Sequence, residues 1–394
     1  MKKVLDILFY AFIGFIFLGI IFYLSPFYIK LNGDKEISLE LFSVYKEEGA
    51  RTIFNQKIET SDTVDTGIVG EQIVKYCHIK SCIERKVKII DKDKPVIELN
   101  GSSEQNIILN GKYVEKGAVA IDNYDGDITD KIEVISHLDL TKAGKYKIIY
   151  KIEDSSNNLS LAYRIINVIE NGPLSLSLKE FNLNGYFADT ILKQTEDAGW
   201  DYVLDTIFYG DSITENMGWY LHDLPESNVW AIHNLTPDNA TSWKVPFNKY
   251  NEEITLVDGM AKYKPKRIII QLGANSVGPN TIEHFISSYE NLITKAKEAS
   301  PESIIIVESV FPVGAKYDTG YNLNNTKINN INYYLAEMCD RIGVYFLNTA
   351  EALKDENGQM NLNYCYKSDN IHLLSSGNQV LLNYVRTHAV FNTK

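Results

Sequence analysis

An uninterrupted apolar segment near the start of the chain, Val4 to Leu24, constrains the protein most strongly. At 1.5 Å per residue, about 20 apolar residues in a helix cross the hydrocarbon core of a bilayer. Lys2 and Lys3 precede the segment, and positive charge is typical of the cytoplasmic side. The sequence therefore predicts a single-pass anchor in the cell membrane, residues 1–30, with the N-terminus inside and the rest of the chain outside. A cleaved signal peptide is the alternative, but its apolar region is usually shorter and ends in small residues.

The composition is that of a globular protein with enough apolar material for several cores. The chain has 394 residues, of which 45% are hydrophobic, and this length predicts two or three domains. The formal net charge is -12, and beyond the N-terminal lysine pair no basic block is present, which argues against nucleic acid as a partner. No grouping of His, Cys and Glu indicates a metal site and no Gly-rich phosphate loop occurs, so we expect no cofactor.

Two related segments follow the predicted anchor. VDTGIVGEQIVKY and LDLTKAGKYKIIY share Asp, Gly five residues later and Tyr six residues after that. Their alternating apolar residues predict short strands in two small all-β sandwiches, residues 31–92 and 93–172. The second, with KPVIELNG, YVEKGAVAIDNYDGDIT and AGKYKIIYKIEDSSNN, resembles bacterial Ig-like domains, and the first is similar to a shorter, divergent copy. This resemblance implies a spacer between membrane and cargo.

Cysteines and clustered acids mark two candidate sites in this part of the chain. Cys77 and Cys82 bracket CHIKSC, and we expect them to form a disulfide across a short hairpin outside the cell. Cys339 and Cys365 can pair or stay as buried thiols. In DNYDGD, the Asp122, Asp125 and Asp127 carboxylates are candidate calcium ligands, but the loop lacks the ligand spacing of known calcium loops. A tight acidic turn without metal is the alternative that we prefer.

From residue 173 to 394 the pattern changes to short apolar runs separated by longer helical stretches. The five runs are TIFYG, VWAI, RIIIQLG, SIIIVESVFP and GVYFLNT. Continuous apolar strands alternating with helices predict a doubly wound α/β domain with a parallel five-stranded sheet. In such a domain the active site lies beyond the carboxyl ends of the strands.

Polar residues stand where that rule places a site. Ser212 follows the first run, Asn275 follows the third, and Asp369 and His372 precede the last helical stretch. A serine hydroxyl becomes a nucleophile when a base takes its proton, and His372 can be that base. Asp369, three residues earlier, can orient the imidazole. The backbone N–H of Ser212 at a helix start and the amide of Asn275 can stabilise an oxyanion.

The order GDSI, GANS and DNIH resembles the SGNH (GDSL-type) hydrolase family. The resemblance covers residues from about 205 to the C-terminus and implies a flavodoxin-like sheet. It also implies that Ser212 is the nucleophile, His372 the base, Asp369 its orienting group and Asn275 an oxyanion donor. The family usually has a Gly after the second strand whose N–H completes the oxyanion hole. VWAIHNLTPDNATSW has none, so the N–H of Asn234, or of Leu235 or Thr236 beside it, is the candidate replacement.

Three residues around these blocks are candidates for contact with a substrate. Ser276 stands where the family often has Asp, Asp211 lies next to the nucleophile, and Trp243 is one of several tryptophans close in sequence to the expected pocket. The alternatives are structural: Ser212 can simply cap a helix, His372 can cap the last helix, and tryptophans are most often core residues.

Together these features predict a membrane-anchored extracellular serine esterase. Its expected substrate is an O-acyl, in the first place O-acetyl, group on a cell-surface or extracellular polysaccharide. The partners would then be an acylated carbohydrate or another small ester, and components of the cell envelope or of polysaccharide synthesis. An O-acyltransferase that uses the same triad is one alternative. A degenerate glycan-binding module without activity is another.

Overall fold

A computed structural model describes residues 2–24, 28–60, 62–79, 81–221, 224–247 and 251–391. Its contacts divide the chain into two compact units. The first unit comprises Met1–Glu98, Ala118–Val134 and Tyr150–Ala162, and the second comprises Leu99–Gly117, Ile135–Ile149 and Tyr163–Lys394. The division runs through the predicted second Ig-like domain rather than along its ends. The domain boundaries after residues 30, 92 and 172 therefore stay predictions.

Helix α1, Lys2–Leu24, contains the whole apolar segment Val4 to Leu24. Its stretch Lys3–Ile20 has a mean hydropathy of 2.1, and none of that stretch is buried inside the protein. A helix that is apolar on all sides needs an apolar environment that the chain itself does not provide here. By length and composition, α1 can cross a membrane.

Two three-stranded sheets form the first β-region. One has the order β1-β3-β4 and is antiparallel, and in the other β6 pairs antiparallel with β5 and parallel with β2. The strands are β1 (Ile29–Leu31), β2 (Glu36–Glu40), β3 (Ala50–Thr52), β4 (Lys57–Ile58), β5 (Gly70–His78) and β6 (Ser81–Ile90). Alternate residues of β5 and β6, such as Val74, Tyr76, Val87 and Ile89, are buried in one core, which is the predicted period of two.

The cysteines occur in two different states. Cys77 and Cys82 lie opposite each other in the register of β5 and β6, and a disulfide joins them. Cys339 and Cys365 are buried free thiols. The sequence left open whether Cys339 and Cys365 form a disulfide, and the structure shows that they do not.

Two further sheets follow in the Ig-like region. The first has the order β10-β9-β7 and the second β11-β12-β13-β8, in which β13 and β8 are parallel. The strands are β7 (Val96–Leu99), β8 (Glu104–Ile108), β9 (Ala118–Asp122), β10 (Gly126–Asp127), β11 (Glu133–Ser136), β12 (Gly144–Glu153) and β13 (Leu159–Ile169), and the 3-10 turns η2 (Thr129–Lys131) and η3 (Gly172–Ser175) lie among and after them. Buried Arg164 donates to the carbonyls of Asn100 and Gly117, which satisfies backbone groups at a strand end.

The remaining strands build a parallel five-stranded sheet with the order β15-β14-β18-β19-β20. Its strands are β14 (Thr206–Gly210), β15 (Val229–Ala231), β18 (Arg267–Gln271), β19 (Ile304–Glu308) and β20 (Tyr345–Leu347). In chain order this is 2-1-3-4-5, the flavodoxin-like arrangement. The predicted doubly wound sheet is confirmed. A separate antiparallel pair, β16 (Val245–Phe247) and β17 (Glu252–Ile254), follows β15.

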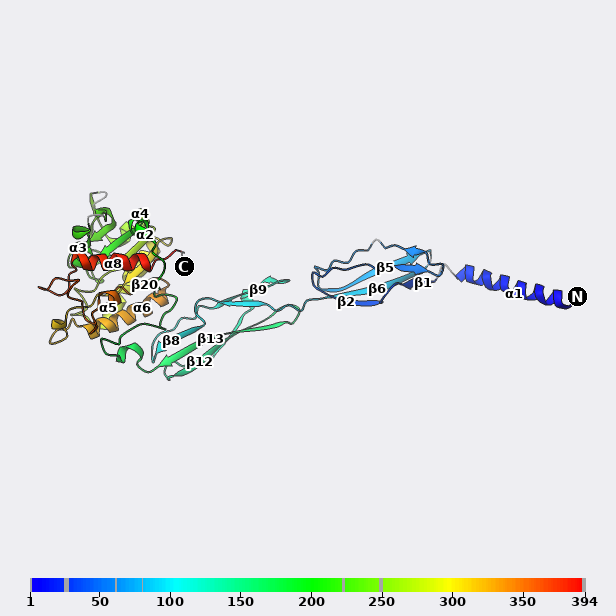
Figure 1. The fold of residues 1–394 in the computed structure, drawn as a ribbon, viewed down its shortest axis with the longest axis horizontal. Helices are drawn as coiled ribbons and strands as arrows, with labels where there is room; N and C mark the ends of the chain where they lie inside the picture. The colour runs from blue at the N-terminus through cyan, green and yellow to red at the C-terminus, as the bar shows by residue number, and fades with distance from the viewer. Residues whose placement is uncertain are drawn as a thin grey trace. The chain divides into compact units, whose positions relative to one another are not determined.

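Helices cover both faces of this sheet (Figure 1). They are α2 (Gly199–Leu204), α3 (Ser212–Tyr220), α4 (Leu256–Tyr263), α5 (Ile282–Ala299), α6 (Asn325–Ile342), α7 (Ala350–Leu353) and α8 (Ser375–Thr387), with 3-10 turns η4 (Glu226–Asn228) and η6 (Ala315–Tyr317). Ile268 and Ile270 of β18 share a core with α4, α5 and α6, while Ile269 shares the opposite core with α2, α3 and α8. Because neighbouring strand residues point to opposite faces, an uninterrupted apolar strand is the sequence pattern of a sheet covered twice.

Polar contacts within the second unit join residues 99–117 to the α/β fold. Lys116 forms an ion pair with Asp340 of α6 at 2.7 Å, and the backbone N–H of Lys112 donates to Glu337 at 3.0 Å. Ser102 donates to Asp189 through its N–H and its hydroxyl. These contacts explain why this end of the Ig-like region belongs to the same compact unit as the α/β domain.

Candidate active site

The predicted catalytic residues gather at the carboxyl edge of the five-stranded sheet. Ser212 opens α3 directly after β14, Asn275 follows β18, and Asp369 and His372 lie in the loop before α8. A Cβ atom at Gly210 would overlap the carbonyl oxygen of Gln271 and the side chain of Thr214. Only glycine therefore permits this close strand-to-helix turn, which leaves Ser212 at the end of the strand.

Ser212, His372 and Asp369 form a continuous chain of hydrogen bonds. His372 Nε2 lies 3.0 Å from Ser212 Oγ, and His372 Nδ1 lies 3.1 Å from Asp369 Oδ2. With its Nδ1–H donated to the carboxylate, the imidazole presents the lone pair of Nε2 to the serine hydroxyl. The imidazole and the carboxylate are each about one third exposed, at 36% and 37%, so a substrate can approach from solvent.

The loop before α8 keeps Asp369 ionised. Burial opposes its charge, but the N–H groups of Ile371 and His372 donate to Oδ1 at 2.8 and 3.0 Å. Together with the imidazole they hold the pKa of Asp369 below its ordinary value. A carboxylate that stays charged stabilises the imidazolium that forms when the serine loses its proton.

Asp211 lies beneath the nucleophile and is completely buried. It caps α3 by accepting the N–H of Ile213 at 3.0 Å. Burial raises its pKa to about 6, even though this N–H, the charge of His372, the N–H of Gly273 and the amide of Asn275 favour the ionised form. The side chain therefore connects the nucleophile helix to the loop after β18 and does not face a substrate.

Asn275, the predicted oxyanion donor, uses its amide inside the protein. Its Nδ2 donates to Asp211 Oδ2 at 3.2 Å and to the carbonyl of Leu235 at 3.4 Å. Both bonds are long, and the second lies near the limit for a hydrogen bond. An oxyanion near Ser212 would therefore compete with the Leu235 carbonyl for one hydrogen of this amide.

Asn234 adopts the backbone conformation that glycine favours. Its φ is +61°, in the left-handed region, where Asn is the commonest non-glycine residue. It lies in the loop after β15, where the expected glycine is missing. In the part of the chain that the structure describes, no hydrogen bond uses the N–H of Asn234. Of the three candidate donors, Asn234, Leu235 and Thr236, Asn234 is thus the one with the backbone conformation of a glycine.

Comparisons with known protein families agree with this geometry. Residues 208–380 match the model of the GDSL-like lipase/acylhydrolase family. The C-terminal region is a GDSL-like serine ester hydrolase domain. Residues 97–168 match the bacterial surface protein Ig-like domain. With the apolar helix α1, this match indicates a membrane-associated or extracellular protein. The search of curated proteins returns no match.

Similar solved structures include three bacterial proteins. A lipoprotein from Bacteroides thetaiotaomicron is 22% identical, with a TM-score of 0.19 over 21% of this chain and 41% of that chain. A mutant of Axe2, an acetyl-xylooligosaccharide esterase from Geobacillus stearothermophilus, is 14% identical, with a TM-score of 0.33 over 47% and 94%. The periplasmic domain of a lipopolysaccharide acetyltransferase from Salmonella ser. Paratyphi A is 18% identical, with a TM-score of 0.34 over 52% and 91%. The aligned part thus spans less than half of the lipoprotein.

The substrate-binding candidates of the GDSL-like domain differ in exposure. Trp243 is 44% exposed, whereas Ser276 is 1% exposed and its hydroxyl has no partner among the described residues. Trp219, in α3, is 63% exposed, while Trp230 is buried in the core. Contact between Ser276 and a substrate would require the loop after β18 to open, whereas both exposed indoles are accessible without movement.

Sequence reasoning missed a second side-chain link between the helices of the site. Asn378 of α8 donates to Asn216 of α3 at 3.0 Å, and both side chains are buried. This bond fixes the helix of Ser212 against the helix that follows His372. The available signal was a polar residue at position 378 on the helix face that also carries apolar Leu381 and Leu382.

The GDSL-like domain also brings an imidazole and a carboxylate together near the nucleophile. His233 Nδ1 lies 3.7 Å from Glu215 of α3, and the His233 side chain is 66% exposed. Glu215 helps to line a cavity of about 170 Å³ with Gly218, Trp219, Glu226, Val229, Ala231 and Pro246. His222, which lies closer to Ser212 in sequence, is outside the described residues.

Proposed function

We propose that this protein is a membrane-anchored extracellular serine esterase that removes O-acyl groups, in the first place O-acetyl groups, from a polysaccharide. The observation that carries the proposal is the unbroken Ser212–His372–Asp369 hydrogen-bond chain. A helix cap alone would not require the imidazole, and a helix-capping histidine would not require the hydroxyl.

The reaction would proceed through an acyl-enzyme. Ser212 Oγ attacks the ester carbonyl while His372 Nε2 takes its proton, and Asp369 stabilises the resulting imidazolium. The imidazolium then protonates the departing sugar oxygen as the carbonyl–oxygen bond breaks. A water molecule, activated by the same imidazole, attacks the acyl-enzyme and releases the carboxylic acid and free Ser212.

The tetrahedral intermediates carry a negative charge that the site has to stabilise. The N–H of Ser212 lies at the start of α3, where backbone N–H groups have no partner within the helix. The N–H of Asn234 would replace that of the missing glycine, and Asn275 would contribute its amide on releasing the Leu235 carbonyl. Each such donor typically contributes about 3–4 kcal/mol to the lowering of the barrier.

A carbohydrate substrate fits the surface beside the nucleophile. Ser212, Glu215 and Trp219 follow one another at the three- and four-residue spacing that places side chains on one face of α3. The exposed indole of Trp219 can stack on the apolar face of a sugar ring, and Glu215 can accept hydroxyl hydrogen bonds. The acyl group would then reach Ser212 while the sugar chain extends along α3.

The location follows from α1 and the β-regions. With Lys2 and Lys3 on the cytoplasmic side, α1 would cross the cell membrane once and leave the esterase domain outside. The two β-regions would then act as spacers that hold the site above the membrane. Partners in this position would be surface polysaccharide and the envelope components that make it.

The test is covalent labelling combined with turnover. Detergent-solubilised full-length protein should react with a fluorophosphonate and release p-nitrophenol from p-nitrophenyl acetate. Ser212→Ala should abolish both, whereas Ser368→Ala, an exposed serine next to Asp369, should leave both unchanged. Labelling that persists in Ser212→Ala would contradict the assigned nucleophile, and no labelling of the wild type would favour a glycan-binding module.

An acceptor experiment distinguishes the hydrolase from the transferase. The acyl-enzyme formed with p-nitrophenyl acetate is divided between water and an added oligosaccharide. A hydrolase releases acetate with or without the oligosaccharide. Acetate release that gives way to acetylated oligosaccharide would overturn the hydrolase in favour of an O-acyltransferase with the same triad.

A further inference from the structure

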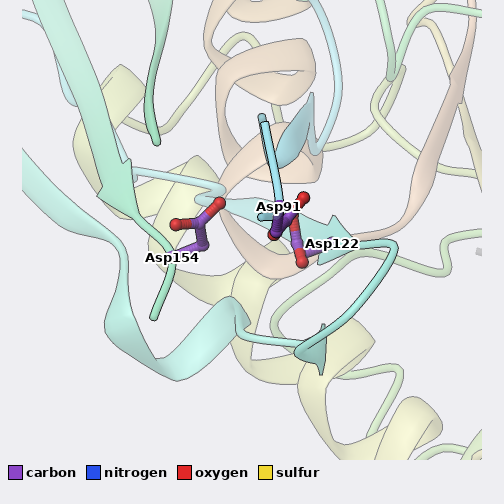
Figure 2. Close-up of side chains that lie close together, drawn as sticks. All are labelled: Asp91, Asp122 and Asp154. Atoms are coloured by element: carbon purple, nitrogen blue, oxygen red, sulfur yellow. The ribbon is translucent and has the colours of Figure 1, made fainter. Parts of the chain in front are cut away.

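Three buried carboxylates from separate segments meet in the first compact unit (Figure 2). Asp91 follows β6, Asp122 ends β9, and Asp154 follows β12. One oxygen of each lies within 4.8 Å of one oxygen of each of the others, and the three residues are 4%, 3% and 6% exposed. Among the described residues, this is the one group of three or more His, Cys, Asp or Glu residues close enough together to hold a metal ion.

The carboxylate oxygens divide into satisfied and unsatisfied ones. Asp122 Oδ1 accepts the N–H groups of Tyr124 and Asp125 at 2.9 and 3.0 Å, and Asp91 Oδ1 accepts that of Asp93 at 3.1 Å. The Oδ2 atoms of Asp91 and Asp122 are buried and have no hydrogen-bond partner in the described part of the chain. Two carboxylates of the cluster thus each have one buried oxygen without a donor among the described residues.

The third carboxylate is better satisfied. Asp154 Oδ1 accepts the N–H groups of Ser156 and Asn158, each at 2.8 Å, and its Oδ2 accepts the Asn158 amide at 2.8 Å. Both carboxylate oxygens of Asp154 therefore have donors, in contrast to Asp91 and Asp122.

We propose that Asp91, Asp122 and Asp154 bind a divalent cation, and that the cation is calcium. Buried like charges are destabilising unless a counter-charge is present, and no Lys or Arg ion pair with these carboxylates occurs in the described residues. The donors are all oxygens, which favours calcium or magnesium over zinc or copper. Ca–O distances of about 2.3–2.6 Å allow ligand oxygens up to about 5 Å apart, whereas Mg–O distances allow about 4 Å.

The ligand set differs from the one that the sequence made a candidate. Of the three acids in DNYDGD, only Asp122 belongs to the cluster. Asp125 accepts the N–H and the hydroxyl of Ser155, and Asp127 accepts the N–H of Thr129. The cation would instead tie the connection after β6 to the turns that follow β9 and β12. Lys92 directly follows Asp91, so the rate of tryptic cleavage after Lys92 measures how often this connection opens.

The experiment uses full-length protein in detergent, stripped with EDTA and titrated with Ca²⁺. Ca²⁺ should raise the unfolding temperature of the first compact unit until the site is saturated, and it should slow tryptic cleavage after Lys92. Tb³⁺ bound at the site should luminesce, and added Ca²⁺ should suppress this luminescence. The dissociation constant should lie near the range of about 10⁻⁴–10⁻³ M that is typical of extracellular calcium modules. No response of the wild type, or an equal response to Mg²⁺, would overturn the calcium site.

Asparagine variants separate cation binding from a structural role. Asp91→Asn and Asp122→Asn keep an oxygen for the turn N–H groups but remove a charge, and should weaken Ca²⁺ binding at least tenfold. Asp127→Asn is the matched control in the same loop and should bind as the wild type does. In EDTA the two cluster variants should unfold at the wild-type temperature or above, because repulsion is relieved. Variants that unfold earlier in EDTA, or that keep wild-type Ca²⁺ affinity, would overturn the proposal.

Discussion

Replacing Asp211 by Asn should change how the stability of the esterase domain depends on pH. The folded pKa of Asp211 is about 6, against an ordinary value of 3.8. Between these values the folded state holds a proton that the unfolded state releases, so stability falls as pH rises from about 4 to 6. At 1.36 kcal/mol per pH unit, ionising this buried carboxyl costs the folded state about 3 kcal/mol above pH 6.

The Asn variant has no proton to lose at this position, yet it keeps an acceptor for the N–H of Ile213. The difference in unfolding free energy between Asp211→Asn and the wild type should therefore shift by about 2 kcal/mol in favour of the variant between pH 4 and pH 7. Absolute stability also includes the altered contact with Asn275, but that contribution does not change across this range of pH. The pH dependence of the difference is the measured quantity.

Urea unfolding, followed by tryptophan fluorescence at each pH, measures this difference in unfolding free energy. All four tryptophans of the chain lie in the esterase domain, so the signal reports on its unfolding; they are Trp200, Trp219, Trp230 and Trp243. Because the charge of His372 also acts on Asp211, the comparison is repeated in a His372→Ala background. Parallel stability curves for variant and wild type from pH 4 to pH 7 would refute the assignment of a strained, ionised Asp211.

The other predictions concern catalysis and the substrate. Asp369→Asn should lower kcat for p-nitrophenyl acetate roughly 10³- to 10⁴-fold while fluorescence-monitored stability changes little, and an unchanged kcat would contradict its orienting role. Asn234→Gly should keep activity and stability, whereas Asn234→Ala should lower the free energy of unfolding by about 1 kcal/mol, because alanine is disfavoured at φ +61°. Equal loss of activity in both variants would show that the side chain, not the N–H, is required. Trp219→Ala should raise KM for an acetylated oligosaccharide without affecting p-nitrophenyl acetate, and a matching loss on both substrates would exclude a sugar contact.

The parallel sheet could be predicted because each of its strands is encoded locally. RIIIQ is apolar on both faces and is bounded by helical segments, and the structure has β18 over these residues, Arg267–Gln271. Ser212 and His372 could be predicted as a pair because parallel strands deliver their following residues to one edge. The structure places them within hydrogen-bond distance, and their catalytic roles stay predictions.

The parts that sequence could not supply depend on loop conformation and on contacts between distant segments. Asn tolerates a positive φ, but nothing else in HNLTPD specifies this conformation for Asn234 or directs the Leu235 carbonyl at Asn275. The contact of Lys116 with Asp340 joins residues that are 224 positions apart, so no local composition marks residues 99–117 as part of the second unit.

Two other buried carboxyl groups show how the chain itself can accommodate a buried acid, and neither arrangement is complete in the cluster around Asp91. N–H donors and an amide around Asp211 offset part of the cost of burying its charge. Glu308, the buried last residue of β19, avoids the cost because burial raises its pKa to about 8, and the hydroxyl of Thr349 donates to it. Asp91 and Asp122 each have one buried oxygen without a donor in the described part of the chain, whereas Asp154 beside them accepts three hydrogen bonds. A divalent cation from outside the chain would satisfy these oxygens together.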